Sequence, residues 1–176
     1  MKDPVVIPVN KKKTIRYLIG ALLLVLLGVL FVVKPFLFIK SDDPTVIKII
    51  GYICTGFFGI GVILFVQKLQ NKKEGLIIDT ESITDHSSGI SAGRVLWRDV
   101  KNIWVEQVAD QPIIMLDVKD PLLYLQQQQN PVKRRAMELN YQLYKTPVGI
   151  SAQFLTIGFE QLLQLLQTSF NEARGK

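Results

Sequence analysis

Cysteine and histidine are almost absent from this 176-residue sequence, which holds one of each. A single thiol, Cys54, allows neither an intramolecular disulfide nor a thiolate metal cluster. The histidine, His86, lies in a polar stretch, and the acidic residues before it do not recur at the spacing of a zinc site, a calcium loop or a phosphate-binding loop. We therefore expect no metal, no cofactor and no catalytic residue, and an enzyme is the last of the function classes considered.

Charge is missing from two long stretches near the N-terminus, in a chain that is 48% hydrophobic. Residues 17–33 carry no charged side chain, and the apolar run resumes after Pro35 to approach the ~20 residues that span a bilayer. A second uncharged run covers residues 49–66. We predict two transmembrane helices in a hairpin, over about residues 17–39 and 47–67.

Basic residues flank these two runs. Residues 1–74 hold eleven Lys and Arg against four Asp and Glu, whereas residues 75–176 hold ten against eleven. Lys11 to Arg16 precede the first run and Lys68 to Lys73 follow the second, so the positive-inside rule places both termini in the cytoplasm. Retention beside a membrane explains this charge better than nucleic-acid binding does. The first run is too long for a secretory signal peptide and no small-residue cleavage site follows it, so we predict an uncleaved anchor.

Small residues recur in both predicted spans. Gly51, Thr55 and Gly59 are spaced by four residues in the second span, and the first span offers Gly20 and Gly28. Such spacing puts small side chains on one helix face, which lets a neighbouring helix approach closely. Two interpretations remain: a packing face, which would also support a homo-oligomer, or the general abundance of glycine in transmembrane helices.

The C-terminal part, residues 75–176, has the length of one ordinary domain. Alternating apolar residues predict several short strands as far as Val118, and residues 146–157 predict a last pair of strands. Asn130 and Pro131 predict the start of a helix inserted between them. Helical spacing predicts the apolar stripe of that helix: Val132, Ala136, Leu139 and Leu143.

A terminal amphipathic helix is predicted by apolar residues that share one helix face: Phe159, Leu162, Leu163, Leu166 and Phe170. A strongly bent antiparallel sheet leaves one end of its core open, and a helix with such a stripe can cover it. We therefore expect this helix to belong to the domain core.

Three stretches carry a resemblance to a family: GLIIDTESITDHSS from Gly75, LWRDVKNI from Leu96, and the stretch from Asn130 to Gln167. With the two spans, they resemble small bacterial inner-membrane proteins that attach a cytoplasmic pleckstrin-homology-like (PH-like) domain to a helical hairpin. The resemblance implies an α+β membrane protein. Residues 1–74 would form a cytoplasmic arm and transmembrane hairpin, and residues 75–176 a half-open antiparallel β-barrel with an inserted helix and a C-terminal capping helix. One departure is Gly158, where these proteins tend to have a serine.

Both tryptophans lie within residues 95–108. By the resemblance, Trp97 stands at a turn between strands, so we expect it to fill the core with Ile103 rather than to bind a ligand. We expect Asp99 to order that turn. Trp104 points to the opposite strand face, where it either enters the bilayer interface or covers the inserted helix.

The basic run of the C-terminal part is Lys133, Arg134 and Arg135, which either is solvated or attracts anionic lipid. Two functions follow from these patterns. One is a membrane-tethered interaction or scaffolding module that docks a protein partner or a lipid headgroup at the cytoplasmic face. The alternative is a regulatory subunit of a transport or envelope-maintenance assembly, whose small-residue helix faces contact other spans. The expected partners are membrane lipid and a protein, with no nucleic acid.

Overall fold

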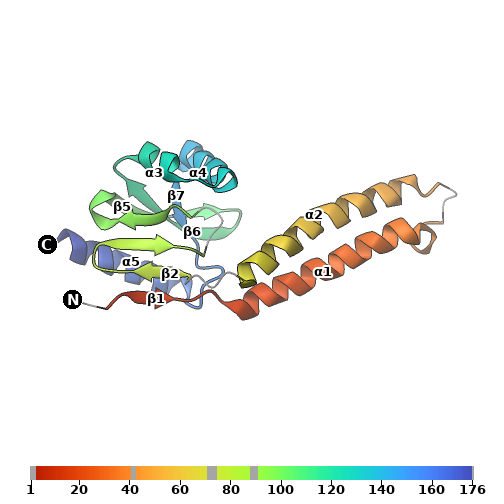
Figure 1. Ribbon diagram of the computed structural model, residues 1–176, viewed down its shortest axis with the longest axis horizontal. Coiled ribbons are helices and arrows are strands. Elements are labelled where there is room, and N and C mark those ends of the chain that lie inside the picture. Colours follow the sequence, from red (N-terminus) through yellow and green to blue (C-terminus); the bar gives the residue numbers. More distant parts are fainter. Residues whose placement is uncertain (1–2, 41–42, 71–74, 88–90, 176) are drawn as a thin grey trace. The chain divides into compact units, whose positions relative to one another are not determined.

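The computed structural model describes residues 3–40, 43–70, 75–87 and 91–175. The chain forms two compact units. One is Lys11–Lys72, and the other combines Met1–Asn10 with Lys73–Lys176. The mixed α+β character is confirmed: two apolar helices are followed by antiparallel sheets (Figure 1). The predicted boundary after Glu74 lies outside the described residues, as do Lys72 and Lys73 of the basic flank.

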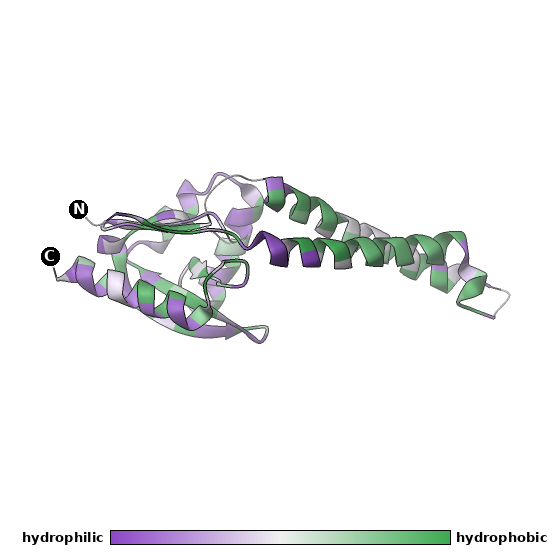
Figure 2. Ribbon diagram, turned by 90° about the horizontal axis from the view of Figure 1, so that it is seen from below, coloured by the Kyte–Doolittle hydropathy of each residue, from purple (hydrophilic) through white to green (hydrophobic). Residues whose placement is uncertain are grey.

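The helical unit contains α1 (Lys11–Val33), the short 3-10 helix η1 (Pro35–Leu37) and α2 (Thr45–Gln70). Apolar residues continue along most of α1 and α2 (Figure 2). Both helices are long and apolar enough to cross a membrane, and only 11% and 6% of their most apolar windows are buried. A core helix of a soluble protein would instead be mostly buried.

The two helices come into close contact at glycines. A Cβ added to Gly28 would lie 2.9 Å from the backbone nitrogen of Thr55, and one added to Gly51 would lie 2.7 Å from the carbonyl oxygen of Gly28. Because no side chain fits there, this contact requires glycine at both positions. Gly28, Gly51 and Thr55 therefore meet inside the hairpin, as a packing face demands.

Gly20 and Gly59 take no part in this contact within the hairpin. A Cβ added to either meets no atom within 4 Å, so neither glycine faces the partner helix. The reason is helical rotation. Eight residues turn an α-helix through two full turns and about 80° more, so a position eight residues from Gly28 or Gly51 leaves the shared face.

The other unit is built on two antiparallel sheets. The first has the order β1-β2-β3-β4, and its strands are β1 (Val5–Ile7), β2 (Leu76–Ile78), β3 (Ser82–Asp85) and β4 (Gly93–Leu96). The second has the order β5-β6-β7, and its strands are β5 (Val100–Val108), β6 (Gln111–Val118) and β7 (Val148–Ile150). The 3-10 turn η2 (Trp97–Asp99) joins the two sheets.

Strand β1 was not predicted. Val5 pairs with Ile78 and Ile7 with Leu76, so the N-terminal arm completes the first sheet. The arm therefore belongs to the sheet-containing unit rather than to the hairpin segment. Val9 also forms an isolated bridge with Leu155. Residues 146–157 therefore contain one strand, β7, and this single bridge, where a pair of strands was predicted.

Three helices complete this unit: α3 (Pro121–Gln127), α4 (Pro131–Tyr144) and α5 (Phe159–Arg174). The Asn130 side chain accepts hydrogen bonds from the backbone of Val132 and Lys133 at 3.0 and 3.1 Å, which confirms the predicted helix start. Helix α3 was missed, since the glutamine run that ends it resembles a loop. Asp120 caps it by accepting a bond from the Leu123 N–H at 3.1 Å.

Both sheets and α5 share one hydrophobic core. Within it, Trp97 is 2% exposed, Leu162 and Leu166 are fully buried, and Phe170 is 7% exposed. The remaining residues of the predicted core are partly buried and pack against it: Ile103, Phe159 and Leu163. Gly158 precedes α5 without a side-chain acceptor, and its N–H donates to Gln161 Oε1 at 3.5 Å.

Candidate functional site

The turn between β2 and β3 is organised by Asp79. Its carboxylate accepts bonds from the backbone N–H groups of Glu81 and Ser82 at 2.8 and 2.7 Å, and from the Ser82 hydroxyl at 2.9 Å. Its carbonyl oxygen accepts the indole N–H of Trp97 at 2.9 Å. The side-chain donor of Trp97 is thus already engaged inside the protein, which favours a structural role for this ring.

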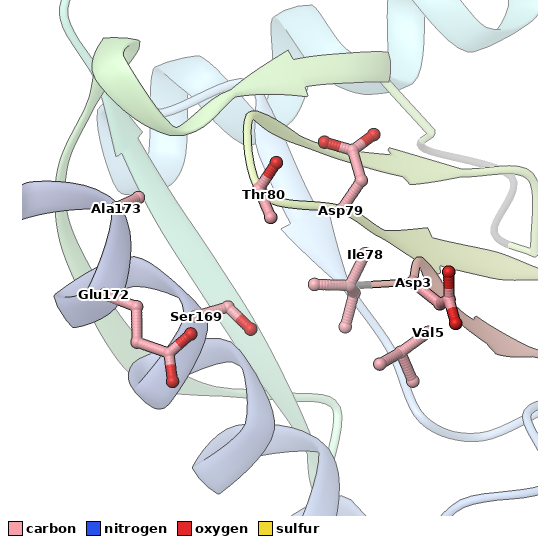
Figure 3. A pocket seen from close by; sticks show the side chains of 8 residues that line it. All are labelled: Asp3, Val5, Ile78, Asp79, Thr80, Ser169, Glu172 and Ala173. Carbon is pink, nitrogen blue, oxygen red and sulfur yellow. The ribbon is translucent and has the colours of Figure 1, made fainter. Parts of the chain in front are cut away.

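A hollow beside this turn is lined by acidic side chains from three parts of the chain. These parts are the residues before β1, the β2–β3 turn and α5. Figure 3 shows that the carboxylates of Asp3, Asp79 and Glu172 do not converge on one point. The hollow measures about 70 Å³, well below the ~300 Å³ of the smallest ordinary ligand pockets. Among the residues that the structure describes, no group of three His, Cys, Asp or Glu side chains can hold a metal ion.

The hydrogen bonds to Asp79 change the pKa of its carboxyl. Burial raises the pKa of this carboxyl, but the N–H groups of Glu81 and Ser82, the Ser82 hydroxyl and the charge of Arg94 outweigh it, so the pKa is lowered from 3.8. A carboxyl whose pKa is lower in the folded state stabilises the fold at pH values above its pKa in the unfolded chain. This stabilisation is lost as the pH falls through the pKa of the folded state.

We therefore expect the thermal unfolding midpoint of the protein to fall below about pH 4, with Asp79 contributing to the slope. Asp79→Asn cannot titrate, so its midpoint should be lower at neutral pH and should depend less on pH in this acidic range. Thermal unfolding followed by circular dichroism from neutral pH downward measures both. Parallel curves for the two proteins would contradict the assignment.

At the end of η2, the hydrogen bonds of Asp99 link the turn to the residue after β6 and to α3, and none that the structure describes goes to the turn's own backbone. The Asp99 carbonyl oxygen accepts the Lys119 N–H at 2.8 Å, and its carboxylate accepts the Tyr124 hydroxyl at 2.9 Å. Burial and this bond to a carboxylate raise the pKa of Tyr124 to about 12. Neutral Tyr124 is therefore a bridge between α3 and the joint of the two sheets, not an ionised nucleophile.

The predicted basic run lies on α4, where acidic charge partly offsets it. Arg134 Nε lies 3.1 Å from Glu138 Oε1, and Arg135 Nη1 lies 3.4 Å from Glu138 Oε2. The arginines are 52% and 69% exposed, and exposed pairs of this kind contribute little to stability. Lys133 is half-buried on the same helix.

Trp104 lies on the sheet face that α4 covers. It is half-buried and stands directly opposite Met115 in the β5–β6 register, so the two side chains share a face. Met115 is fully buried, and its sulfur lies 3.7 Å from Asn140 Nδ2 of α4. These contacts favour the interpretation in which Trp104 covers the inserted helix.

The apolar stripe predicted for α4 is not its buried face. Val132, Leu139 and Leu143 are 77%, 46% and 70% exposed. The buried positions are Met137, which joins the hydrophobic core, and Asn140, whose Nδ2 donates to the carbonyl oxygen of Thr146 at 3.1 Å. Met137 and Tyr141, four residues apart, contact the hydrophobic core from this side of the helix.

An exposed apolar surface therefore lies on α4, where the helical spacing predicted one stripe, and exposed leucines lie on the neighbouring α3. We call it the α3–α4 surface, and it consists of five side chains: Leu122, Leu123, Val132, Leu139 and Leu143. Leu122 and Leu123 are 55% and 43% exposed. Val132, Leu139 and Leu143 follow one stripe of α4, and an exposed apolar stripe is typical of an interaction site.

The fold and these surfaces define a mixed α+β protein with two long, exposed apolar helices and an antiparallel sheet-containing unit. Comparison of the chain with protein-family models, curated proteins and solved structures found no match.

Proposed function

We propose that this chain is a membrane-tethered interaction module, in which α1 and α2 span a bacterial inner membrane and the sheet-containing unit docks a protein partner in the cytoplasm. The observation that carries the proposal is the exposure of α1 and α2: their side chains need an apolar surrounding that the rest of the chain does not supply. Lys11 to Arg16 lie in the first turns of α1 and Lys68 in the last turn of α2, at the ends that are cytoplasmic in this topology.

The arrangement of the sheet-containing unit supports a PH-like assignment. Two antiparallel sheets joined by a sharp turn share a core with a C-terminal helix, which is the layout expected of a half-open barrel and its capping helix. We infer docking rather than catalysis because the carboxylates of Asp79 and Asp99 are engaged in hydrogen bonds within the unit, to Ser82 and to Tyr124.

A protein is the favoured partner over a lipid headgroup. The α3–α4 surface is apolar, and the arginines nearest to it along α4 are paired with Glu138, which reduces their attraction for anionic lipid. A partner that presents apolar side chains would remove Val132 and Leu143 from water.

The test places a photocrosslinking amino acid at Leu143 in the full chain, in native membranes. We expect a crosslinked protein band that disappears when Leu139 is also changed to Asp, and no band from a control probe at Gln107, an exposed position of β5. Lipid adducts in place of a protein band would transfer the proposal to a headgroup. No adduct at Leu143 would reject docking at this surface.

A reporter fused after Lys176 tests the membrane topology separately. We expect activity from a reporter that works only in the cytoplasm, and none from one that works only outside, because the basic flanks hold both ends inside. The reverse result, or extraction of the protein from membranes by alkaline carbonate, would overturn the tethered topology.

A further inference from the structure

The helical unit contains a groove that lies entirely within the hairpin. It has a volume of about 530 Å³ and is lined from α1 and α2 by residues at helical spacing, including Arg16, Gly20, Leu24, Phe57, Gly61 and Leu64. This volume lies in the range of sites that hold a small ligand, ~300 to 1,000 Å³.

Glycines create the groove. A Cβ added to Gly20 or to Gly61 meets no atom within 4 Å, so the missing side chains leave open space that the hairpin does not fill. Aromatic rings add to its lining. Tyr17 and Phe65 stack across the two helices with ring centroids 6.0 Å apart, and Phe57 is 70% exposed.

The groove has positive charge at one end, and the described residues of the two helices add no negative charge to it. Arg16 lines it in the second turn of α1, and Lys11 to Lys13 precede this arginine on the same helix. Neither α1 nor α2 contains an acidic residue. An occupant that matches both features has an apolar chain and an anionic head.

We propose that the groove binds an anionic phospholipid, with one acyl chain between Gly20 and Gly61 and the phosphate on Arg16. The proposal rests on the proposed membrane insertion of the hairpin. Basic pockets between helices on the cytoplasmic side of a membrane suit anionic headgroups, and a guanidinium holds a phosphate through paired hydrogen bonds.

A second copy of the chain fits the groove less well. Two copies in the same membrane orientation pack about an axis along the membrane normal, so equivalent residues meet at equal depth. Arg16 would then face the Arg16 of the other copy, in an environment where acidic side chains are missing from both helices. A phosphate between the helices neutralises this charge instead of doubling it.

The test uses the full chain purified in detergent and native mass spectrometry during titration with phosphatidylglycerol or phosphatidylcholine. We expect one phosphatidylglycerol to be retained at least about tenfold more strongly than phosphatidylcholine. Gly61→Leu fills the groove and Arg16→Gln removes the charge, so each should abolish this preference or reduce it about tenfold. Gly20→Leu fills the groove from the opposite wall and should match Gly61→Leu.

Gly56→Leu is the matched control, because Gly56 also has open space around it and does not line the groove. It should bind phosphatidylglycerol as the unchanged chain does. Equal retention of both lipids, unchanged binding in Gly61→Leu and Gly20→Leu, or a lipid-free dimer lost in these variants would overturn the proposal. Carbonate extraction of the same variants separates the two failures: a chain that stays in the membrane without this lipid preference refutes the groove and leaves the tether intact.

Discussion

Trp97→Ala is expected to lower the free energy of unfolding of the sheet-containing unit by about 3 to 5 kcal/mol. The ring is 2% exposed, and its centroid lies 6.5 Å from that of Phe170 in α5. Its N–H also satisfies the Asp79 carbonyl at 2.9 Å. Alanine therefore leaves a cavity between η2 and α5 and an acceptor without its partner. Denaturant unfolding of the full chain in detergent, followed by circular dichroism, measures the loss.

Two variants separate the contributions of Trp97. Trp97→Phe keeps an aromatic ring but lacks the N–H, so it should retain part of the packing energy and lose about 1 kcal/mol for the hydrogen bond. Trp104→Ala removes a half-buried ring from the sheet face under α4 and should cost clearly less than Trp97→Ala. Equal losses for the two alanine variants would show that the two tryptophans are not distinguished by their strand faces.

Features that depend on neighbouring residues were predictable from the sequence. The apolar helices follow from uncharged runs, the start of α4 from Asn130 and Pro131, and the buried stripe of α5 from its spacing. Trp97 was predictable as a core residue, although from a resemblance rather than from spacing. In each case the signal lies within a few residues of the element that it specifies.

Features that depend on distant partners were not predictable. Strand β1 has three residues, and its partner strand β2 begins at Leu76, far along the chain. Helix α4 turns Met137 and Asn140 inward, where Met137 joins the core and Asn140 donates to the Thr146 carbonyl, although the apolar pattern of the helix favoured another face. No local pattern reveals that a polar side chain will be the buried one.

The groove in the hairpin shows the same limit for the candidate site. The small residues of the two helices allowed two interpretations, a packing face or the general abundance of glycine, and the structure divides them between a contact at Gly28 and Gly51 and open space at Gly20. The cause is that a four-residue step exceeds one helical turn by about 40°, so a stripe of small residues winds around the helix. Which part of the stripe meets the partner depends on where the helices cross.

Removal of α5 by truncation after Thr156 is expected to abolish cooperative folding of the sheet-containing unit. The helix supplies three deeply buried side chains to the shared core: Leu162, Leu166 and Phe170. At about 1.5 to 3 kcal/mol for each buried side chain, their loss is comparable to the whole stability of a typical domain, about 5 to 15 kcal/mol. Truncation also exposes Trp97, which packs against Phe170.

Hydrogen exchange of the full-length and truncated chains, measured on peptides from β5 and β6, tests this directly. We expect slow exchange in the full chain and loss of protection throughout the unit after truncation, while α1 and α2 in detergent keep theirs. Single substitutions locate the cause within the helix: Leu166→Ala should cost about 2 to 5 kcal/mol, and Gln167→Ala, at an exposed position, should be close to neutral. If β5 and β6 stay protected without α5, the sheets close their core unaided, and the helix is an attachment rather than part of the fold.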